Sequence, residues 1–396
     1  DFLTFFKLRG SYGIIGNDRI ADFGFESSLN GEGVYVINDA LVFGSAVGTI
    51  SNPEIKWEEQ KTFDIGVDAR FMDNALNVTV DYFNRRTEDL LVTAPVSGIL
   101  GASAPGSGPP IVNAGTVVNK GFEFSIGYNH EFSDDFRMNA SFNLTTIDNE
   151  VVFVNSENAF IPGGSFGVGQ DFPARMEAGF PIGYFRGYKT QGIFQTQADV
   201  DGHATQMNAV PGDIRFVDVN GDGIITVDDQ TNIGDPIPDV TFGMNFSIDY
   251  KNFDFLVYAF ASVGNDIVRN YERFQQLTNR STSFLDRWTG PGTSNSSPRV
   301  TTAATSNTQF SEFFVEDGSF IRIQNIQFGY TLPDAFSKKL KLDSFRVYTS
   351  VTNAFTFTKY KGYDPTASSG SPIGAGIDNG FYPTPRTFLV GLNVKL

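Results

Sequence analysis

The chain has 396 residues, with 45 acidic and 29 basic side chains and a formal net charge of −16. This excess of negative charge repels a phosphate backbone, so nucleic acid is not an expected partner. The absence of cysteine excludes disulfides, thiolate-bound metals and thiol nucleophiles, and His130 and His203 are the only histidines. Charged residues make up only 19%, against about 25% in an average soluble domain, while 40 residues are Phe. This balance predicts either a large β core or Phe side chains that face lipid.

The strongest pattern along the chain is strict alternation of apolar and polar residues, which is the period of a strand with two different faces. Three pairs of alternating segments are each joined by a short polar turn, which predicts β-hairpins. The pairs are 62–71 and 76–82 around Met72 to Asn74, 122–132 and 136–145 around Ser133 to Asp135, and 240–250 and 253–261 around Lys251-Asn252.

Alternation continues to the C-terminus at 326–332, 345–355 and 388–396. Ile321 and Ile323 precede the first of these segments in the opposite phase, which predicts a β-bulge near Gln324-Asn325. Weaker candidate strands lie around 6–14, 22–28 and 172–194, so about twelve strands are expected in total. No run of 18 or more apolar residues occurs, which excludes a transmembrane helix.

Short and long connections alternate between the predicted strands. The long ones are rich in Gly, Pro, Ser and Asn and cover 93–119, 150–170, 195–238, 265–311 and 361–385. Alternation of this kind is typical of an up-and-down transmembrane barrel with short periplasmic turns and long extracellular loops. Aromatic residues crowd the short turns, as an interfacial girdle requires. The alternative is a soluble sandwich or propeller whose apolar strand faces form a core.

Ordered short motifs spread over the whole chain are similar to those of one family. They include Phe6 to Gly13 with Gly16-Asn17, Trp57-Glu58, Asn119 to Glu123, Pro211 to Phe216, Arg322 to Ile326, Gly362 to Pro365 and Pro385 to Phe388. In this order they resemble SusC/RagA-like TonB-dependent outer-membrane transporters, and the resemblance covers essentially all 396 residues. One departure is the last residue, Leu396, where such barrels commonly end in an aromatic residue.

The resemblance implies an all-β, antiparallel barrel of about 22 strands in the bacterial outer membrane, with an N-terminal plug. Residues 1–396 would form the C-terminal part of the barrel, and neither a plug sequence nor a TonB box is recognisable in them. The implied function is import of glycans or peptides, without enzymatic activity. The implied partners are membrane lipid, the TonB complex and a SusD-like surface lipoprotein. If the chain is such a portion of a barrel, its first and last strands should not pair with each other.

The long connection at 195–238 contains an acidic motif, DVNGDGIITVDD, at 218–229. Calcium prefers six to eight oxygen ligands, and this spacing places oxygen donors at loop positions 1, 3, 5, 7 and 12. The predicted ligands are the side chains of Asp218, Asn220, Asp222 and Asp229 and the carbonyl of Ile224. Gly223 permits the sharp turn, and Thr226 lies where a water often mediates. The sequence therefore predicts a structural calcium site, and the alternative is an acidic surface turn without an ion.

Other residues suggest weaker hypotheses. Tyr184, Phe185 and Tyr188 could stack on sugar rings or pack against a plug or lid. His130 continues the apolar register next to a turn, which favours an interfacial aromatic role, and His203 is expected to be solvated. No Ser, His and Asp arrangement is recognisable. The rival function is a soluble, secreted, calcium-binding β protein that binds glycans.

Overall fold

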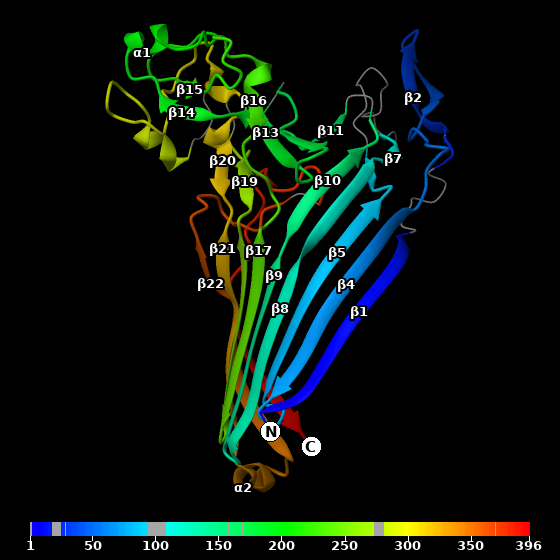
Figure 1. The fold of residues 1–396 in the computed structure, drawn as a ribbon, viewed down its shortest axis with the longest axis vertical. Coiled ribbons are helices and arrows are strands. Elements are labelled where there is room, and N and C mark those ends of the chain that lie inside the picture. The colour runs from blue at the N-terminus through cyan, green and yellow to red at the C-terminus, as the bar shows by residue number, and fades with distance from the viewer. Residues whose placement is uncertain are drawn as a thin grey trace.

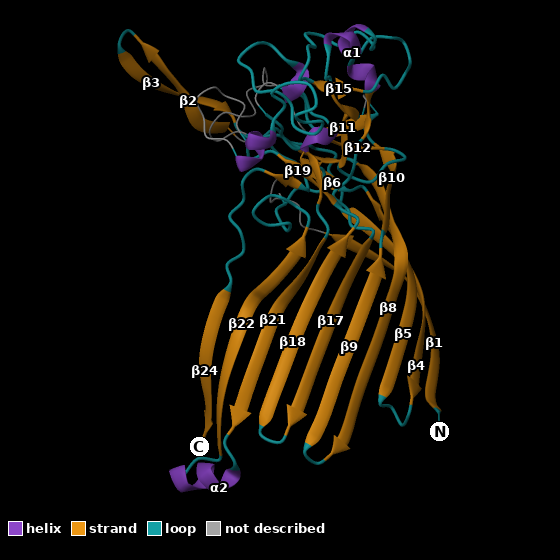
Figure 2. Ribbon diagram, turned by 90° about the vertical axis from the view of Figure 1, so that its left-hand side faces the viewer, coloured by secondary structure: helices purple, strands orange, loops and turns teal. Residues whose placement is uncertain are grey.

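The computed structural model describes residues 2–17, 25–27, 29–93, 108–156, 159–167, 170–272, 281–368 and 370–396. Its main element is a curved antiparallel sheet of 11 strands, called here the wall. Figure 1 and Figure 2 show the long loops gathered at one end of the wall, with both termini near the other end. In the part of the chain that is described, no helix is long and apolar enough to cross a membrane.

Strands adjacent along the wall are also consecutive wall strands in the sequence. Their order is β1 (Leu3–Asn17), β4 (Glu58–Phe71), β5 (Leu76–Glu88), β8 (Gly115–Ser133), β9 (Phe136–Thr146), β17 (Val240–Tyr250), β18 (Phe253–Val263), β21 (Phe320–Thr331), β22 (Ser344–Thr358) and β24 (Thr387–Lys395). The remaining strand, β10 (Asp148–Val154), pairs with the loop-side part of β8. This order confirms the up-and-down arrangement and the predicted hairpins.

The turns at the end of the wall opposite the loops are short. Met72, Asp73 and Asn74 all have positive φ, the conformation that a tight strand connection requires, and so does Lys251. The turn between β21 and β22 is larger and holds α2 (Asp334–Ser337) and the 3-10 helix η6 (Lys338–Leu340). The predicted alternation of short and long connections is thereby confirmed (Figure 2).

The two faces of the wall differ in chemistry across neighbouring strands. Ile126 on β8 lies opposite Val78 on β5 and Phe142 on β9, whereas Ser125 lies opposite Thr79 and Asn143. Paired residues in an antiparallel sheet share a face, so one face is apolar and the other polar over these strands. Apolar side chains on the first face are open to the surroundings: Phe63 is 46% exposed and Val390 is 78% exposed.

Aromatic rings form a row beside the short turns. Phe136 stacks on Phe132 with ring centroids 5.0 Å apart and meets Tyr250 at 6.1 Å. His130 belongs to this row, because its ring lies 4.6 Å from that of Phe132 and 5.9 Å from that of Tyr128. This placement is the one expected for an interfacial aromatic girdle.

The wall is an open sheet. Strand β1 pairs with β4 and strand β24 pairs with β22, but the two edge strands do not pair with each other. The predicted absence of pairing between the first and last strands is confirmed. The β-bulge is confirmed too, since the register of β21 shifts between Ile323 and Asn325 against both of its neighbours.

Two of the weaker strand predictions need correction. Residues 172–194 add no strand to the wall; they form β12 (Ala174–Glu177), β13 (Tyr184–Tyr188) and β14 (Thr190–Ile193) in small separate sheets. These strands are too short to span a membrane, and their residues pack among the loops. In the segment 22–28, residues 22–24 and 28 lie outside the described residues, and residues 25–27 form no strand. An unexpected hairpin of β2 (Leu29–Ile37) and β3 (Ala40–Val47) follows.

The long connections fold into small sheets and short helices, called here the loop assembly. Its other strands are β6 (Leu91–Thr93), β7 (Ile111–Asn113), β11 (Phe160–Gly163), β15 (Ile214–Phe216), β16 (Gln230–Asn232), β19 (Asp266–Arg269), β20 (Val315–Asp317) and β23 (Ile377–Asp378). Its helices are α1 (Gln197–Asp201) and the 3-10 turns η2 (Val227–Asp229), η3 (Thr282–Asp286), η4 (Ser306–Thr308) and η5 (Glu312–Phe314).

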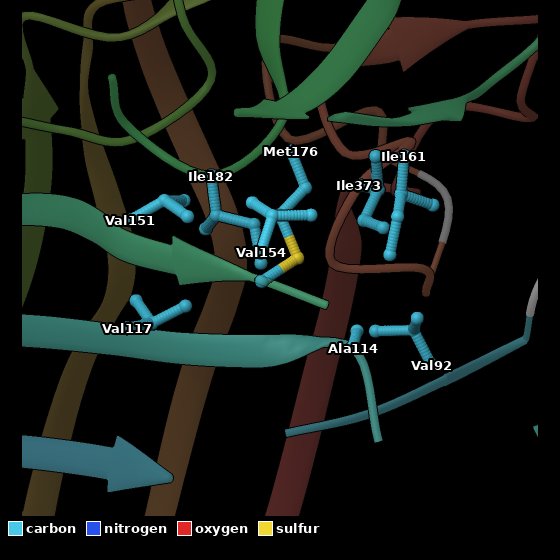
Figure 3. Packing of buried hydrophobic residues seen from close by; sticks show 9 residues of the cluster. All are labelled: Val92, Ala114, Val117, Val151, Val154, Ile161, Met176, Ile182 and Ile373. Atoms are coloured by element: carbon cyan, nitrogen blue, oxygen red, sulfur yellow. The ribbon is translucent and has the colours of Figure 1, made fainter. Parts of the chain in front are cut away.

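A hydrophobic cluster joins the loop assembly to the wall (Figure 3). Val117 on β8 and Val151 on β10 come from the wall, while Met176, Ile182 and Ile373 come from loops far apart in the sequence. All five side chains are at least nine-tenths buried, so they remove a continuous apolar surface from water. The cluster holds the loop assembly over the end of the wall.

Candidate functional site

A buried carboxylate ties together the two longest connections of the loop assembly. Asp213, which is fully buried, forms a two-pronged ion pair with Arg299, with Nε–Oδ1 and Nη2–Oδ2 distances of 2.7 and 3.2 Å. It also accepts hydrogen bonds from Asn307 Nδ2 at 2.8 Å and Thr305 Oγ1 at 3.1 Å. Four donors of this kind satisfy the oxygens of a charge that would otherwise be costly to bury.

Side chains around β15 reinforce this connection. Gln206 donates to the Ile214 carbonyl and accepts from the Phe216 amide, at 2.8 and 3.0 Å. His203 was expected to be solvated, but the structure places it half-buried against Phe194, with Nε2 2.8 Å from the Phe216 carbonyl oxygen. Burial lowers the pKa of His203, although the bond to that carbonyl opposes the shift. The histidine is therefore a packing residue of the loop assembly.

A second buried carboxylate anchors a different loop to the wall. Arg322 on β21 forms an ion pair with Asp364 at 2.6 Å, and both side chains are only 7% exposed. Burial opposes ionisation of Asp364, but hydrogen bonds from the amides of Thr366 and Thr384 and from Arg322 outweigh it and lower its pKa. These bonds tie Asp364, Thr366 and Thr384 to β21 of the wall. Asp213 and Asp364 both lie in motifs that carry the family resemblance, but the sequence alone assigned them no role.

The acidic motif at 218–229 forms a compact turn at the loop end of the molecule. The two carboxylate oxygens of Asp218 accept the amides of Gly221 and Gly223, at 2.7 and 2.9 Å, and Asp222 accepts the amide of Ile224 at 2.8 Å. Because a carboxylate has about four lone-pair sites, these bonds leave room for a cation. Asp218 and Asp222 are thus compatible with the predicted ligand role.

The closing residue of the motif, Asp229, has a clear structural role. It is fully buried, and its oxygens accept the amides of Val219 at 2.8 Å, Asn220 at 3.3 Å and Thr226 at 2.8 Å. Burial alone would raise the pKa of Asp229, but these bonds outweigh it and lower the pKa. With Thr226 it forms a capping box on η2.

The predicted calcium ligands therefore lie within one turn, but their side chains are directed largely at its backbone. Within the described ranges, no three acidic or histidine side chains come together in a way that could hold a metal ion. The calcium prediction relies in addition on the Asn220 amide oxygen and the Ile224 carbonyl oxygen, and it stays a prediction.

The aromatic residues considered for sugar stacking are buried. Tyr184, Phe185 and Tyr188 are 2%, 0% and 5% exposed. Tyr184 stacks on Phe180 with ring centroids 4.4 Å apart, and Tyr188 stacks on Phe216 at 4.7 Å. Other rings of the loop assembly cover Tyr184 and Tyr188, and Phe185 is buried in a hydrophobic cluster, so the three residues do not present ring faces to a sugar. They pack within the loop assembly itself, whereas the alternative considered was packing against a plug or lid.

Comparison with known proteins identifies the class to which this wall and its loops belong. Residues 4–354 match the family described as TonB dependent receptor-like, beta-barrel. The chain belongs to this family of outer-membrane β-barrel proteins, which confirms the resemblance, the fold class and the outer-membrane location.

Individual relatives include two TonB-dependent receptors and one solved structure with the same fold. The chain is 35% identical over 405 residues to TonB-dependent receptor P3 of Formosa agariphila, covering 99% of this chain and 39% of that protein. It is 31% identical over 417 residues to TonB-dependent receptor SusC of Bacteroides thetaiotaomicron, covering 99% of this chain and 38% of SusC. The RagAB peptide transporter has the same fold, with a TM-score of 0.78 at 23% identity over 100% of this chain and 41% of that chain. The chain thus spans about two fifths of the length of each of these relatives.

Proposed function

We propose that residues 1–396 are the C-terminal part of the barrel of a TonB-dependent outer-membrane importer of glycans or peptides, which works with a SusD-like surface lipoprotein. The observation that carries the proposal is the wall itself, with one apolar face, one polar face and two unpaired edges. The relatives named above support it, since they are TonB-dependent receptors and one of them is SusC.

The apolar face supports contact with lipid. Phe63, Ile65 and Phe328 are each at least 44% exposed, although all lie within long regular strands. A soluble β protein would bury such a face in a core, because exposed apolar area costs about 25 cal/mol per Å². In a membrane the same face contacts lipid chains. The exposed apolar face therefore argues against the rival function, a soluble glycan-binding protein.

The polar face supports a water-filled lumen. Arg9 on β1 forms an ion pair with Asp68 at 2.8 Å and another with Asp81 at 2.8 Å. Arg346 on β22 is bound to Asp254 on β18, with Nε 2.8 Å from Oδ1. Paired charges of this kind are stable next to water and are expensive in contact with lipid. A polar solute could therefore pass along this face.

The unpaired edges support a larger barrel. Leu8 on β1 and Val390 on β24 are 66% and 78% exposed, and the outer backbone groups of both strands have no partner strand in the described wall. In a bilayer each unpaired backbone group costs several kcal/mol, so further strands should close the barrel. The lipoprotein would contact the loop assembly, and TonB would act from the opposite, short-turn end.

Uptake measurements in cells can test the proposal. A strain that lacks the full-length protein and its complemented counterpart are given fluorescent oligosaccharides and fluorescent peptides in parallel. We expect uptake of one class to fall to background without the protein, and to require the proton gradient in the complemented strain. Unchanged uptake of both classes in the deletion strain would contradict the proposal.

A further inference from the structure

Two arginines of the loop assembly lie on the same face of one small sheet. Arg175 on β12 is paired with Tyr184 on β13, and Arg186 follows two residues later on that strand. Arg186 is therefore the diagonal neighbour of Arg175, at a distance of about 7–8 Å between positions of this type. The opposite face of the same strands carries Ala174 and Phe185, which are fully buried in a hydrophobic cluster. Because successive side chains of a strand point to opposite faces, Arg175 and Arg186 lie on the face opposite to Ala174 and Phe185.

These two arginines line one cavity with a volume of about 370 Å³. Small-molecule sites are typically about 300–1,000 Å³, so the cavity can hold one sugar unit of a larger ligand. The lining of this cavity also includes Tyr188 and the amide side chains of Gln230 and Gln309. The single acid in its lining is Asp171, which is exposed.

The positive charge in this cavity is incompletely neutralised. Arg186 donates to two neutral acceptors, Gln230 Oε1 at 2.6 Å and the Val227 carbonyl at 3.2 Å. Arg175 makes no hydrogen bond from its guanidinium to any described residue, and its nearest acid, Glu177, is 3.9 Å away and also accepts the Tyr184 hydroxyl. Burial, and then the charge of Arg186, lower the pKa of Arg175. Two like charges in a partly buried cavity are unfavourable unless an anion joins them.

The orientation of Arg175 leaves its donors available. Its guanidinium carbon lies 3.9 Å from the centre of the Phe160 ring, so the ring covers the flat side of the group. A guanidinium stacked on an aromatic ring keeps its N–H groups free in its own plane, where they can bind a carboxylate or sulfate through two parallel hydrogen bonds.

We propose that this cavity binds a carboxylate or sulfate group of an acidic oligosaccharide, held between Arg175 and Arg186. The inference rests on the proposed import function and specifies its substrate class. A peptide fits less well, because extended peptides commonly bind by adding a strand to a sheet edge. Strands β12 and β13 are the two inner strands of the order β11-β12-β13-β16 and have no free edge.

Binding to the purified full-length protein provides the test. Calorimetry compares four probes of equal length: an oligouronate, a sulfated neutral-backbone oligosaccharide, the unsulfated neutral oligosaccharide and an oligoglutamate peptide. Arg175→Gln and Arg186→Gln should each weaken binding of an acidic oligosaccharide about 10- to 100-fold, which is the loss expected for a charge-assisted hydrogen bond. Binding should also weaken as salt is raised. The first two probes distinguish carboxylate from sulfate as the bound group.

Arg137→Gln is the matched control, because Arg137 lies beside a short turn at the far end of β9 and its side chain is 54% exposed. It should leave all binding unchanged, and Arg175→Lys should lose affinity although it keeps the charge. The inference is overturned if neither acidic oligosaccharide binds, if the Gln variants bind them normally, or if the oligoglutamate peptide alone depends on the arginines. If any of these three results were obtained while cells still took up the neutral oligosaccharide, the proposed import function would remain supported and only the acidic-substrate inference would be wrong. Arginine-dependent binding without uptake of any probe would contradict the import function alone.

Discussion

Arg299 and Asp213 form a two-pronged ion pair in which the carboxylate is fully buried and the guanidinium is only 20% exposed. The pair joins the segment before β15 to a loop 86 residues later in the sequence. Because the carboxylate oxygens also receive bonds from Thr305 and Asn307, removal of Asp213 leaves several donors unpaired, and removal of Arg299 leaves a buried carboxylate without its counter-charge. The pair is therefore a candidate for the interaction that keeps the loop assembly in one conformation.

Asp213→Ala should loosen the loop assembly and leave the wall intact. Breaking a buried pair by removing one partner typically costs about 3–5 kcal/mol. Hydrogen exchange measured by mass spectrometry should show faster exchange in residues 206–216 and 299–307, with no change in β4, β5 and β8. Arg137→Ala, which breaks an exposed pair with Glu131, should have no such effect. Unaltered exchange in Asp213→Ala would contradict the assigned role.

The two faces of β8 should respond differently to the same substitution. Ile126 lies on the apolar face near the middle of the strand, so Ile126→Arg should cost about 2–4 kcal/mol and impair assembly in the membrane. Ser125→Arg is its matched control on the polar face and should be much milder. Folding of the full-length protein into lipid vesicles, followed by gel mobility without heating, measures both. Equal tolerance at the two positions would refute the lipid-facing assignment.

The wall could be predicted from the sequence because a lipid-facing strand needs an unbroken apolar face. Ten or more alternating residues, as at 122–132, leave little ambiguity about period or register. The bulge near Gln324 was also predictable, since a change of phase has one simple structural cause. About twelve strands were expected where the wall has 11, because the described residues of 22–28 and 172–194 contribute no wall strand and β10 was not expected.

The loop assembly could not be predicted in the same way. Strands of three to five residues carry too few positions for a period, so β12 and β13 were read as one weak candidate for the wall. The partners of Asp213 and the proximity of Arg175 to Arg186 depend on pairings between distant segments. Tyr184, Phe185 and Tyr188 are aromatic residues in a loop, and composition alone does not reveal that such a loop has its own core.

Asp266 on β19 should make the loop assembly sensitive to pH. Burial, together with the charges of Asp235, Asp317 and Asp239, raises the pKa of Asp266 to about 6, although the Asp235 amide opposes the shift. The unfolded value is about 3.9. The folded state therefore binds more protons between about pH 4 and pH 6, and the free energy of unfolding falls as pH rises through this range.

Asp266→Asn should therefore stabilise the loop assembly near neutral pH and change little below about pH 4, where the aspartate is protonated in both states. Hydrogen exchange of residues 266–269 at several pH values measures the effect. Asp317→Asn is a control with the opposite expected pH dependence. Hydrogen bonds from Ser319 lower the pKa of Asp317, so the stabilisation that the Asp317 carboxylate provides is lost as pH falls. A stability of the wild-type loop that does not change over this pH range would contradict the prediction.

The acidic turn at 218–229 is expected to bind calcium with a dissociation constant of about 10⁻⁴ to 10⁻³ M, the range of extracellular modules. Asp222→Ala should abolish binding, because Asp222 is exposed and its removal does not disturb the buried bonds of Asp229. Asp228→Ala is the matched control, since Asp228 is also exposed and lies outside the predicted ligand set. Calorimetric titration of the full-length protein with calcium measures both variants.

Calcium should also affect the arginine cavity, because the carbonyl of Val227, inside the acidic turn, accepts a hydrogen bond from Arg186. An ion that stiffens the turn would hold this carbonyl, and hence Arg186, in place. Calcium should therefore slow hydrogen exchange in residues 218–229 of the wild type and of Asp228→Ala but not of Asp222→Ala, while the wall strands remain unchanged in all three. Ion density with oxygen ligands at about 2.3–2.6 Å would identify the site directly. Absence of binding at millimolar calcium, or binding through a different set of residues, would show that the motif is only a capped acidic turn.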